Sequence, residues 1–365
     1  MGRYILRRLM LIVPTLFGIL LLTFVIAQFA PGGPIEQIIA RATMGNVSTT
    51  SNFSGGGGDA GVSSQAMDQT LTGGDNLGTY GLDPEMLADL EKQFGFDKPV
   101  HVRFFSMVGN YLTFDFGESY FQDRPVIELI IERMPVSISL GLWSLLIIYG
   151  ISIPLGVAKA VRDGTAFDFW TSTVIFVGYA IPGFILAILL IILFAGGNYF
   201  DIFPLRGLTS ENWSELSFFG KIGDYFWHLA MPLTALTVGG FATLSMLTKN
   251  SFLEEISKQF VLTARAKGLT ERRVLYGHVF RNAMLIVIAG FPSAFVGIFF
   301  YGSVLVEVIF SLEGMGLLSY DALIKRDYPI LFGSLFMFGM VGLVMHLIGD
   351  LTYVVVDPRI DFESR

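Results

Sequence analysis

Hydrophobic residues along the chain gather into six long runs separated by polar stretches. A bilayer core of about 30 Å needs about 20 helical residues, and each run meets that length. The six predicted spans are Leu9–Ala30, Ser137–Ala158, Trp170–Gly196, Phe226–Thr248, Asn282–Val306 and Leu331–Val356. We expect the first run to be retained as a span, because it contains Pro14 and ends without a small-x-small cleavage pattern. The pattern therefore predicts an all-α membrane protein with six transmembrane helices.

The distribution of Lys and Arg between the spans predicts the orientation. With the N-terminus inside, the inner segments 1–8, 159–169, 249–281 and 357–365 hold 14 basic residues in 61 positions. The outer segments 31–136, 197–225 and 307–330 hold 10 basic residues in 159 positions. Because basic residues concentrate on the cytoplasmic side of a membrane, both termini are predicted to be cytoplasmic.

These boundaries divide the chain into four regions. Residues 1–30 hold the N-terminus and first span, 31–136 form a periplasmic region, 137–356 hold spans two to six, and 357–365 form a cytoplasmic tail. Within the periplasmic region, residues 42–80 are a Gly-rich insert that is predicted not to fold alone. Residues 83–134 are amphipathic and rich in aromatic residues, with a last amphipathic turn at Arg124–Met134. We expect them to form short helices that cap the outer mouth of the protein.

Composition narrows the function. The mean hydropathy is +0.61 and only 15% of residues are charged, against about 25% in soluble proteins. The absence of Cys excludes disulfides, thiolate metal sites and Cys nucleophiles, and the net charge of -7 argues against a nucleic-acid partner. No Gly-x4-Gly-Lys-Ser/Thr phosphate loop occurs. We therefore predict a membrane protein with no enzymatic site and no cofactor of its own, so that any active transport would take its energy from a partner.

The inner loop 249–281 is amphipathic. Its apolar residues recur at helical spacing, Gly268 interrupts the pattern, and a second, basic helix is predicted over Glu271–Phe280. The first-helix residues that recur are Phe252, Ile256, Phe260, Val261 and Ala264. Spacing alone leaves two interpretations open, a surface helix anchored by its positive charge or a docking element for a cytoplasmic partner.

If the loop docks a partner, each of its central residues has an expected role. The small Ala264 and Ala266 would allow close approach of a partner, and Arg265 and Lys267 would meet its acidic groups or helix C-termini. Gly268 would end the first helix in a left-handed conformation, which is cheap only for glycine.

Several phrases carry a resemblance to a known family. Residues 260–269 read Phe-Val-Leu-Thr-Ala-Arg-Ala-Lys-Gly-Leu, and residues 278–283 read His-Val-Phe-Arg-Asn-Ala. The other phrases are Arg7–Leu9, Ala30–Pro34, Glu307, Phe310–Leu318, Arg326–Pro329, Asp350 and Asp357–Arg359. In this order they resemble the inner-membrane permease subunits of ABC importers for dipeptides and oligopeptides. The loop resembles the family's ATPase-coupling motif, Glu-Ala-Ala, three residues, then Gly, although Leu262-Thr263-Ala264 lacks the acidic residue.

The resemblance implies a fold, partners and a substrate. It implies the type I ABC importer permease fold, with the ATPase-coupling loop at Leu262, Thr263, Ala264, Arg265, Ala266, Lys267 and Gly268. It further implies a second permease subunit, ABC ATPases that bind ATP and Mg²⁺, a periplasmic peptide-binding protein, surrounding membrane lipid and a peptide substrate. The insert 42–80, Phe96–Pro99, Ala180–Pro182 and the ending Asp357–Glu363 resemble one branch of the family, which implies oligopeptides and antibiotics of the microcin C type.

A secondary transporter coupled to protons or ions is the alternative, since such proteins place ionisable residues inside the membrane. The predicted spans contain His346 and Asp350, four residues apart on one helical face, which could relay protons or serve in packing and capping. A channel is a weaker third class, because no filter-like sequence occurs.

Helix-breaking residues lie inside several predicted spans. The candidates for pathway or hinge positions are Pro182, Gly183, Pro232, Gly239, Gly240 and Pro292. Membrane helices tolerate such residues where neighbouring groups satisfy the freed carbonyls, so they are expected either to permit kinks and close packing or to line a flexing pathway.

Overall fold

The computed structural model describes residues 2–29, 98–195, 197, 199–297 and 304–356. It divides into two compact units, Phe17–Asp115 on the one hand and Met1–Leu16 with Phe116–Arg365 on the other. The Gly-rich insert 42–80, the beginning of the predicted periplasmic helices and the tail 357–365 lie outside the described residues. Within the described residues the regular structure is helical, with one isolated bridge between Glu118 and Pro125.

The smaller unit holds the second half of α1 (Gly2–Phe29) and the helix α4 (Val100–Leu112). Phe104 of α4 is buried, and its ring meets those of Phe17 and Phe24 edge to face at centroid distances of 5.4 and 5.3 Å. The prediction that 83–134 contains a short aromatic-rich helix is thus confirmed for α4. Its place at an outer mouth stays a prediction.

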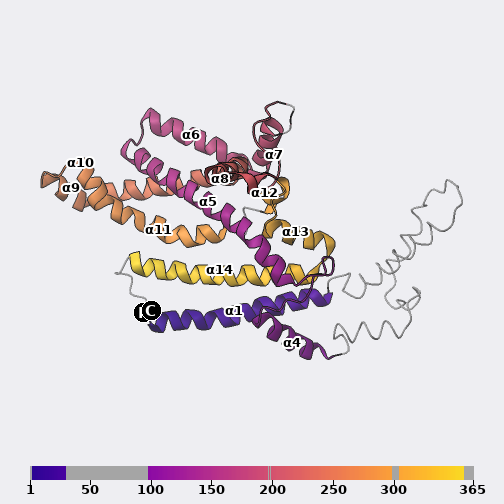
Figure 1. Cartoon of the computed structure of the whole chain (residues 1–365). Coiled ribbons are helices and arrows are strands. Elements are labelled where there is room, and N and C mark those ends of the chain that lie inside the picture. The colour runs from indigo at the N-terminus through magenta and orange to yellow at the C-terminus, as the bar shows by residue number, and fades with distance from the viewer. Residues whose placement is uncertain (1, 30–97, 196, 198, 298–303, 357–365) are drawn as a thin grey trace, which may run out of the picture. The chain divides into compact units, whose positions relative to one another are not determined.

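The larger unit contains the remaining helices (Figure 1). In chain order these are α5 Val126–Val161, α6 Ala166–Ala180, α7 Gly183–Phe194, a 3-10 turn Trp213–Glu215, α8 Phe218–Ile256, α9 Gln259–Ala266, α10 Glu271–Val274, a π-helical turn Leu275–Val279, α11 Phe280–Gly297, α12 Val304–Ile309, α13 Met315–Lys325 and α14 Tyr328–Val356. The long helix α8 is central, because α5, α6, α7 and α11 all pack against it. The turn expected at Arg124–Met134 is instead the first part of α5.

Five described helices are long and apolar enough to cross a membrane, and a sixth crossing is counted if α6 and α7 form one span. The third predicted span, Trp170–Gly196, is broken at the predicted helix breakers, because α6 and α7 meet at an angle of 92°. Pro182 explains the break. Its ring disfavours helical backbone at Ile181, which is extended with φ -88° and ψ 116°. The fifth predicted span, Asn282–Val306, includes residues outside the described part.

Two clusters of buried apolar side chains stabilise the larger unit. One lies where the ends of α5 and α8 meet the α9–α11 segment and includes Val157, Phe252 and Val279. The other lies toward the opposite ends of these helices, where Leu140, Leu229 and Phe310 bring together α5, α8 and the end of α12. Many other apolar side chains are exposed, as is expected of helices whose outer faces contact lipid or partner subunits.

A buried carboxylate fixes the short helix α13 to α5. Glu307 is fully buried and accepts hydrogen bonds from the Ser137 hydroxyl at 2.8 Å and the Leu317 backbone N–H at 2.9 Å. Ser137 Oγ in turn accepts from the Met315 N–H at 2.8 Å. A Cβ added to Gly314 would lie 2.5 Å from the Glu307 carboxyl, so a larger residue there would displace this carboxyl from its hydrogen bonds. The sequence motifs include Glu307 and Phe310–Leu318, but they do not predict that Glu307 is buried and joins α13 to α5.

Candidate ATPase-docking loop and pathway cavity

The segment after α8 forms two short helices joined by a glycine turn. α9 ends at Ala266, and Gly268 has φ +81°. The Gly268 N–H donates to the Arg265 carbonyl at 2.9 Å, and the Leu269 N–H donates to the Ala264 carbonyl at 3.3 Å. This pair of bonds is the Schellman arrangement that ends helices at a left-handed glycine. The predicted helix–Gly–helix and the conformation of Gly268 are therefore confirmed.

α9 buries one face and exposes the other. Val261 is fully buried and Ala264 is 7% exposed, and both belong to the apolar cluster that includes Phe252 and Val279. The small side chain of Ala264 therefore serves packing within this chain, which corrects the expectation that it faces a partner. Leu262 is apolar and 60% exposed, and it lies on the outer face of α9. The other exposed members of the predicted motif are Thr263, Arg265, Ala266, Lys267 and Gly268.

Arg265 ties the two short helices together. Its Nε and one terminal nitrogen donate to the two carboxylate oxygens of Glu271, at 2.9 and 3.0 Å. Arg265 is thus engaged across the glycine turn, and the expectation that it meets a partner's acidic group stays a prediction. Lys267 has no ion pair within the described residues and keeps that capacity.

The start of α9 carries a second local ion pair. The ammonium group of Lys258 contacts the carboxylates of Glu255 and Glu254 at the end of α8. The hydrogen bond to Glu255 raises the pKa of Lys258. A hollow of about 350 Å³ opens between the end of α5 and the loop, with Val261, Arg265 and Tyr276 among its lining residues. The loop is thus held in one shape by its own residues before any partner binds.

A second hollow, of about 290 Å³, lies at the break between α6 and α7. It is lined by Gly183, Phe184, Ala235, Leu236, Gly239, Leu305 and Val306. The structure therefore brings Gly183 and Gly239, two of the predicted pathway positions, to one cavity, with Pro182 next to it in the chain. No charged side chain lines this cavity among the described residues.

The other predicted hinge residues serve helix contacts. A Cβ added to Gly240 would lie 2.5 Å from the Ile148 side chain of α5. Pro292 of α11 is buried, and a Cβ added to Gly349 of α14 would lie 3.2 Å from its ring. Pro232 is buried within α8. These residues fit the close-packing interpretation that the sequence left open beside the pathway one.

The proposed proton-relay pair is not formed. Asp350 Oδ2 pairs with Arg8 Nε at 3.0 Å, and His346 is exposed. Within the described residues His346 makes no contact with Asp350. Asp350 thus joins the beginning of α1 to the end of α14, in the packing role that the sequence offered as one alternative.

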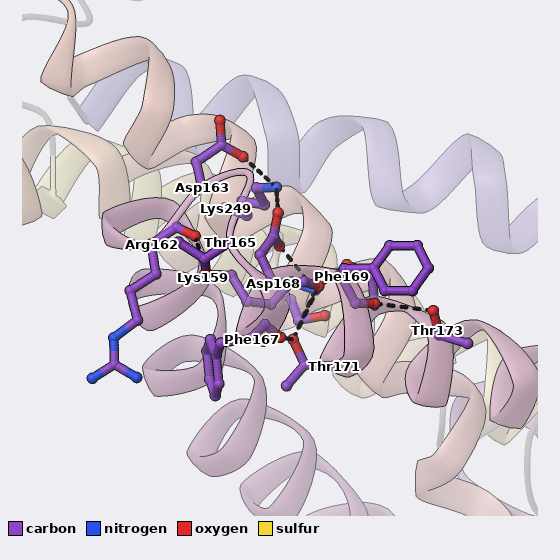
Figure 2. A network of polar contacts seen from close by, with 12 residues as sticks. Lys159, Arg162, Asp163, Thr165, Phe167, Asp168, Phe169, Thr171, Thr173 and Lys249 are labelled. Carbon is purple, nitrogen blue, oxygen red and sulfur yellow. Dashed lines mark hydrogen bonds and ion pairs between the residues drawn. The ribbon is translucent and has the colours of Figure 1, made fainter.

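Sequence reasoning missed a charged cluster at the ends of α5 and α8 (Figure 2). Lys159 of α5 is fully buried, and its ammonium lies 3.5 Å from Asp168 Oδ1 of α6. Lys249 of α8 lies 2.7 Å from Asp168 Oδ2 and 2.7 Å from Asp163 Oδ1. Removing one partner of such a buried pair costs about 3–5 kcal/mol in proteins. The only signal in the sequence is the presence of these charges at the ends of apolar helices.

Comparisons with known proteins agree with this architecture. A family model described as "Binding-protein-dependent transport system inner membrane component" matches residues 152–362. A chain of the MetNI methionine ABC transporter in an inward-facing conformation has a similar fold, with a TM-score of 0.50 and 17% identity. The match covers 63% of this chain and 97% of that one.

Three relatives match over nearly the whole chain. The "Peptidoglycan transport system permease protein YejB" of Agrobacterium fabrum is 58% identical, with full coverage of both chains. The "Inner membrane ABC transporter permease protein YejB" of Escherichia coli O157:H7 is 53% identical, also with full coverage. The "Oligopeptide transport system permease protein AppB" of Bacillus subtilis is 32% identical over 99% of this chain and 100% of its own length.

The fold and these matches define an all-α permease of the type I ABC importer class, as predicted. The chain belongs to the family of binding-protein-dependent transport system inner membrane components, and its relatives include YejB and the more distant peptide permeases that the sequence motifs resemble. It is a multi-pass inner-membrane protein.

Proposed function

We propose that this chain is one permease subunit of an ATP-driven importer of peptides, and that its α9–α10 loop is where the ATPase docks. The observation that carries the proposal is the loop itself. Its two short helices are joined by the Gly268 turn and bridged by the Arg265–Glu271 pair, its inner face packs on α5 and α8 through Val261 and Ala264, and its outer face exposes the apolar Leu262. A rigid, partly apolar projection of this kind suits transfer of force from a partner.

The proposed orientation places both termini and the α9–α10 loop in the cytoplasm. The density of basic residues in the inner segments supports it. The Arg8–Asp350 pair supports placing the two termini on the same side of the membrane, because it joins the beginning of the first span to the end of the last one. Residues 31–136 would then face the periplasm and contribute to the surface that receives the binding protein.

The proposed assembly contains a second permease, ABC ATPases that bind ATP and Mg²⁺, and a periplasmic peptide-binding protein. In the branch that the sequence resembles, these correspond to proteins of the YejE, YejF and YejA kinds. The names of two relatives, an oligopeptide and a peptidoglycan transport permease, support peptides and oligopeptides as the substrate class. Antibiotics of the microcin C type rest on the sequence resemblance alone.

Uptake of a labelled oligopeptide into cells that carry the full transporter tests this proposal. Uptake should be lost when the ATPase is deleted and should return with the intact ATPase, because this chain is proposed to depend on a partner for energy. Uptake that persists without the ATPase would support a secondary transporter and overturn the proposal.

A variant of the loop connects this test to the docking site. Leu262→Glu should leave the permease inserted but reduce co-purification of the ATPase and peptide uptake about tenfold or more, because it places a charge in the proposed contact. Asn250→Glu is the matched control, since it adds the same charge at an exposed position on α8 before the loop. Equal ATPase binding by both variants would contradict docking at Leu262.

A further inference from the structure

The charged cluster formed by Lys159, Asp163, Asp168 and Lys249 links three helices in one place. The carboxylate of Asp168 lies between two ammonium groups, with Lys249 at 2.7 Å and Lys159 at 3.5 Å (Figure 2). Lys159 also donates to the hydroxyl of Thr171 at 3.5 Å and to that of Ser172. The Gly164 N–H donates to Asp168 Oδ2 at 3.3 Å. The cluster therefore fixes the first turn of α6 to the ends of α5 and α8.

Burial differs between the two aspartates of the cluster. The side chain of Asp168 is 11% exposed, whereas that of Asp163 is 51% exposed and, within the described part of the chain, forms an ion pair with Lys249 only. If a buried carboxylate shared by two cations is removed, water cannot easily solvate the cations in its place, because it would have to enter the packed site. The ion pair of a half-exposed carboxylate contributes little, because water screens it and can take the place of either partner. Asp168 is therefore the member on which the connection between the helices depends.

The position of Lys249 connects the cluster to the docking loop. Lys249 lies two helical turns before Ile256, where α8 ends and the α9–α10 loop begins. Close packing at the same level holds α5 to α8, since a Cβ added to Gly156 would lie 2.6 Å from the Thr248 side chain and 2.7 Å from the Ser245 carbonyl oxygen. A force on the loop would thus reach Lys249 through rigid, packed helix.

From Asp168, the path from the docking loop to the cavity continues along α6. This helix extends to Ala180, next to the break at Pro182 and the cavity there. This far end of α6 is also fixed to α8. A Cβ added to Gly178 would lie 2.7 Å from Val238, and one added to Gly183 would lie 2.9 Å from the Ala235 carbonyl oxygen. α6 is held to α8 by ion pairs at its start and by close packing at its end.

We propose that Asp168 and Lys249 are positioning residues for transport, which make α6 and the cavity at its end move together with α8 when the docked ATPase displaces the loop. This inference rests on the proposed function, because it requires an ATPase at the α9–α10 loop. It assigns the coupling of ATP hydrolysis to transport partly to an ionic connection between α6 and α8, made by two residues that lie 81 positions apart in sequence.

The test compares purified transporter complexes in lipid vesicles that carry Asp168→Asn, Lys249→Met or Asp163→Asn. Asp168→Asn and Lys249→Met should assemble with the ATPase and hydrolyse ATP, but peptide uptake per ATP should fall about tenfold, because α6 no longer follows α8. Asp163→Asn is the matched control, and its uptake should stay within about twofold of wild type. Lys249→Arg keeps the charge and should restore most of the uptake.

A purely structural role predicts a different pattern. If Asp168→Asn and Lys249→Met both failed to assemble with the ATPase, the ion pairs would serve folding alone and the proposal would be overturned. Normal uptake per ATP in both variants would overturn it as well. Since Lys249→Met leaves the Lys159–Asp168 pair in place, it tests the connection with the smaller disturbance.

The outcome separates this inference from the proposed function. Wild-type uptake that does not need the ATPase would overturn the proposed function and the coupling role with it. Wild-type uptake that needs the ATPase, together with unaffected variants, would overturn the ionic connection alone.

Discussion

Two interruptions of the helical structure, at Gly268 and at Pro182, differ in what surrounds them. A Cβ added to Gly268 would meet nothing within 4 Å, and its φ of +81° alone demands glycine. The break at Pro182 is packed, because the next residue, Gly183, lies against the Ala235 carbonyl of α8. The turn at Gly268 is exposed on the surface, whereas the break at Pro182 lies beside the cavity between α6, α7 and α8. Similar breaker residues thus serve different roles according to their neighbours.

The largest effect is expected at the packed break. Gly183→Ala should destabilise the protein by about 1–3 kcal/mol, because the new methyl group would press on backbone that cannot move aside. Thermal unfolding in detergent measures this loss. Gly239→Ala is the control, since Gly239 lines the same cavity but has open space around it. Equal melting temperatures for the two variants would show that the break is not fixed by this contact.

An intermediate effect is expected at the open turn. Gly268→Leu forces a side chain into left-handed backbone, at a local cost of about 1–2 kcal/mol. The permease should still fold, but ATPase co-purification and peptide uptake should fall about tenfold as the α9–α10 turn changes shape. Gly277→Leu is the control, because Gly277 also has open space but has no positive φ. Similar losses in both variants would mean that added bulk rather than backbone conformation matters.

The smallest effect is expected at the exposed ion pair across the open turn. Arg265→Glu should cost only about 0.2–1 kcal/mol of stability, as exposed pairs do, although it places two carboxylates together. The double exchange Arg265→Glu with Glu271→Arg tests what the pair does. Recovery of peptide uptake in the double variant is expected if Arg265 acts within the loop. Uptake that stays low in the double variant would indicate that Arg265 contacts the partner directly.

The sequence predicts the parts of this architecture that depend on local rules. Runs of apolar residues locate the helices that cross the membrane, and an isolated glycine in a basic, amphipathic loop predicts the left-handed turn at Gly268. The break at Pro182 is visible as a proline, but its angle of 92° depends on how Gly183 packs on α8. The face on which Ala264 lies depends likewise on the cluster beneath it.

Contacts between distant residues could not be predicted in this way. Arg265 and Glu271 are six residues apart across a turn, outside the three- and four-residue spacings that pair side chains on one helix. Asp350 has a helical neighbour in His346, yet it pairs with Arg8 from the other end of the chain. Asp168 and Lys249 meet only because α6 packs along α8. These pairings follow from tertiary packing, which one sequence does not contain.

Site-directed cross-linking tests the central claim, that the α9–α10 loop is the ATPase-docking element, most directly. The chain has no cysteine, so a single Ala266→Cys or Glu211→Cys places one reactive thiol at an exposed position. Glu211 lies between α7 and α8, in a segment proposed to be periplasmic, and serves as the matched control. In the assembled transporter, a short thiol-to-amine cross-linker should join the ATPase to position 266 and not to position 211. A cross-link from position 211 with none from position 266 would contradict the account.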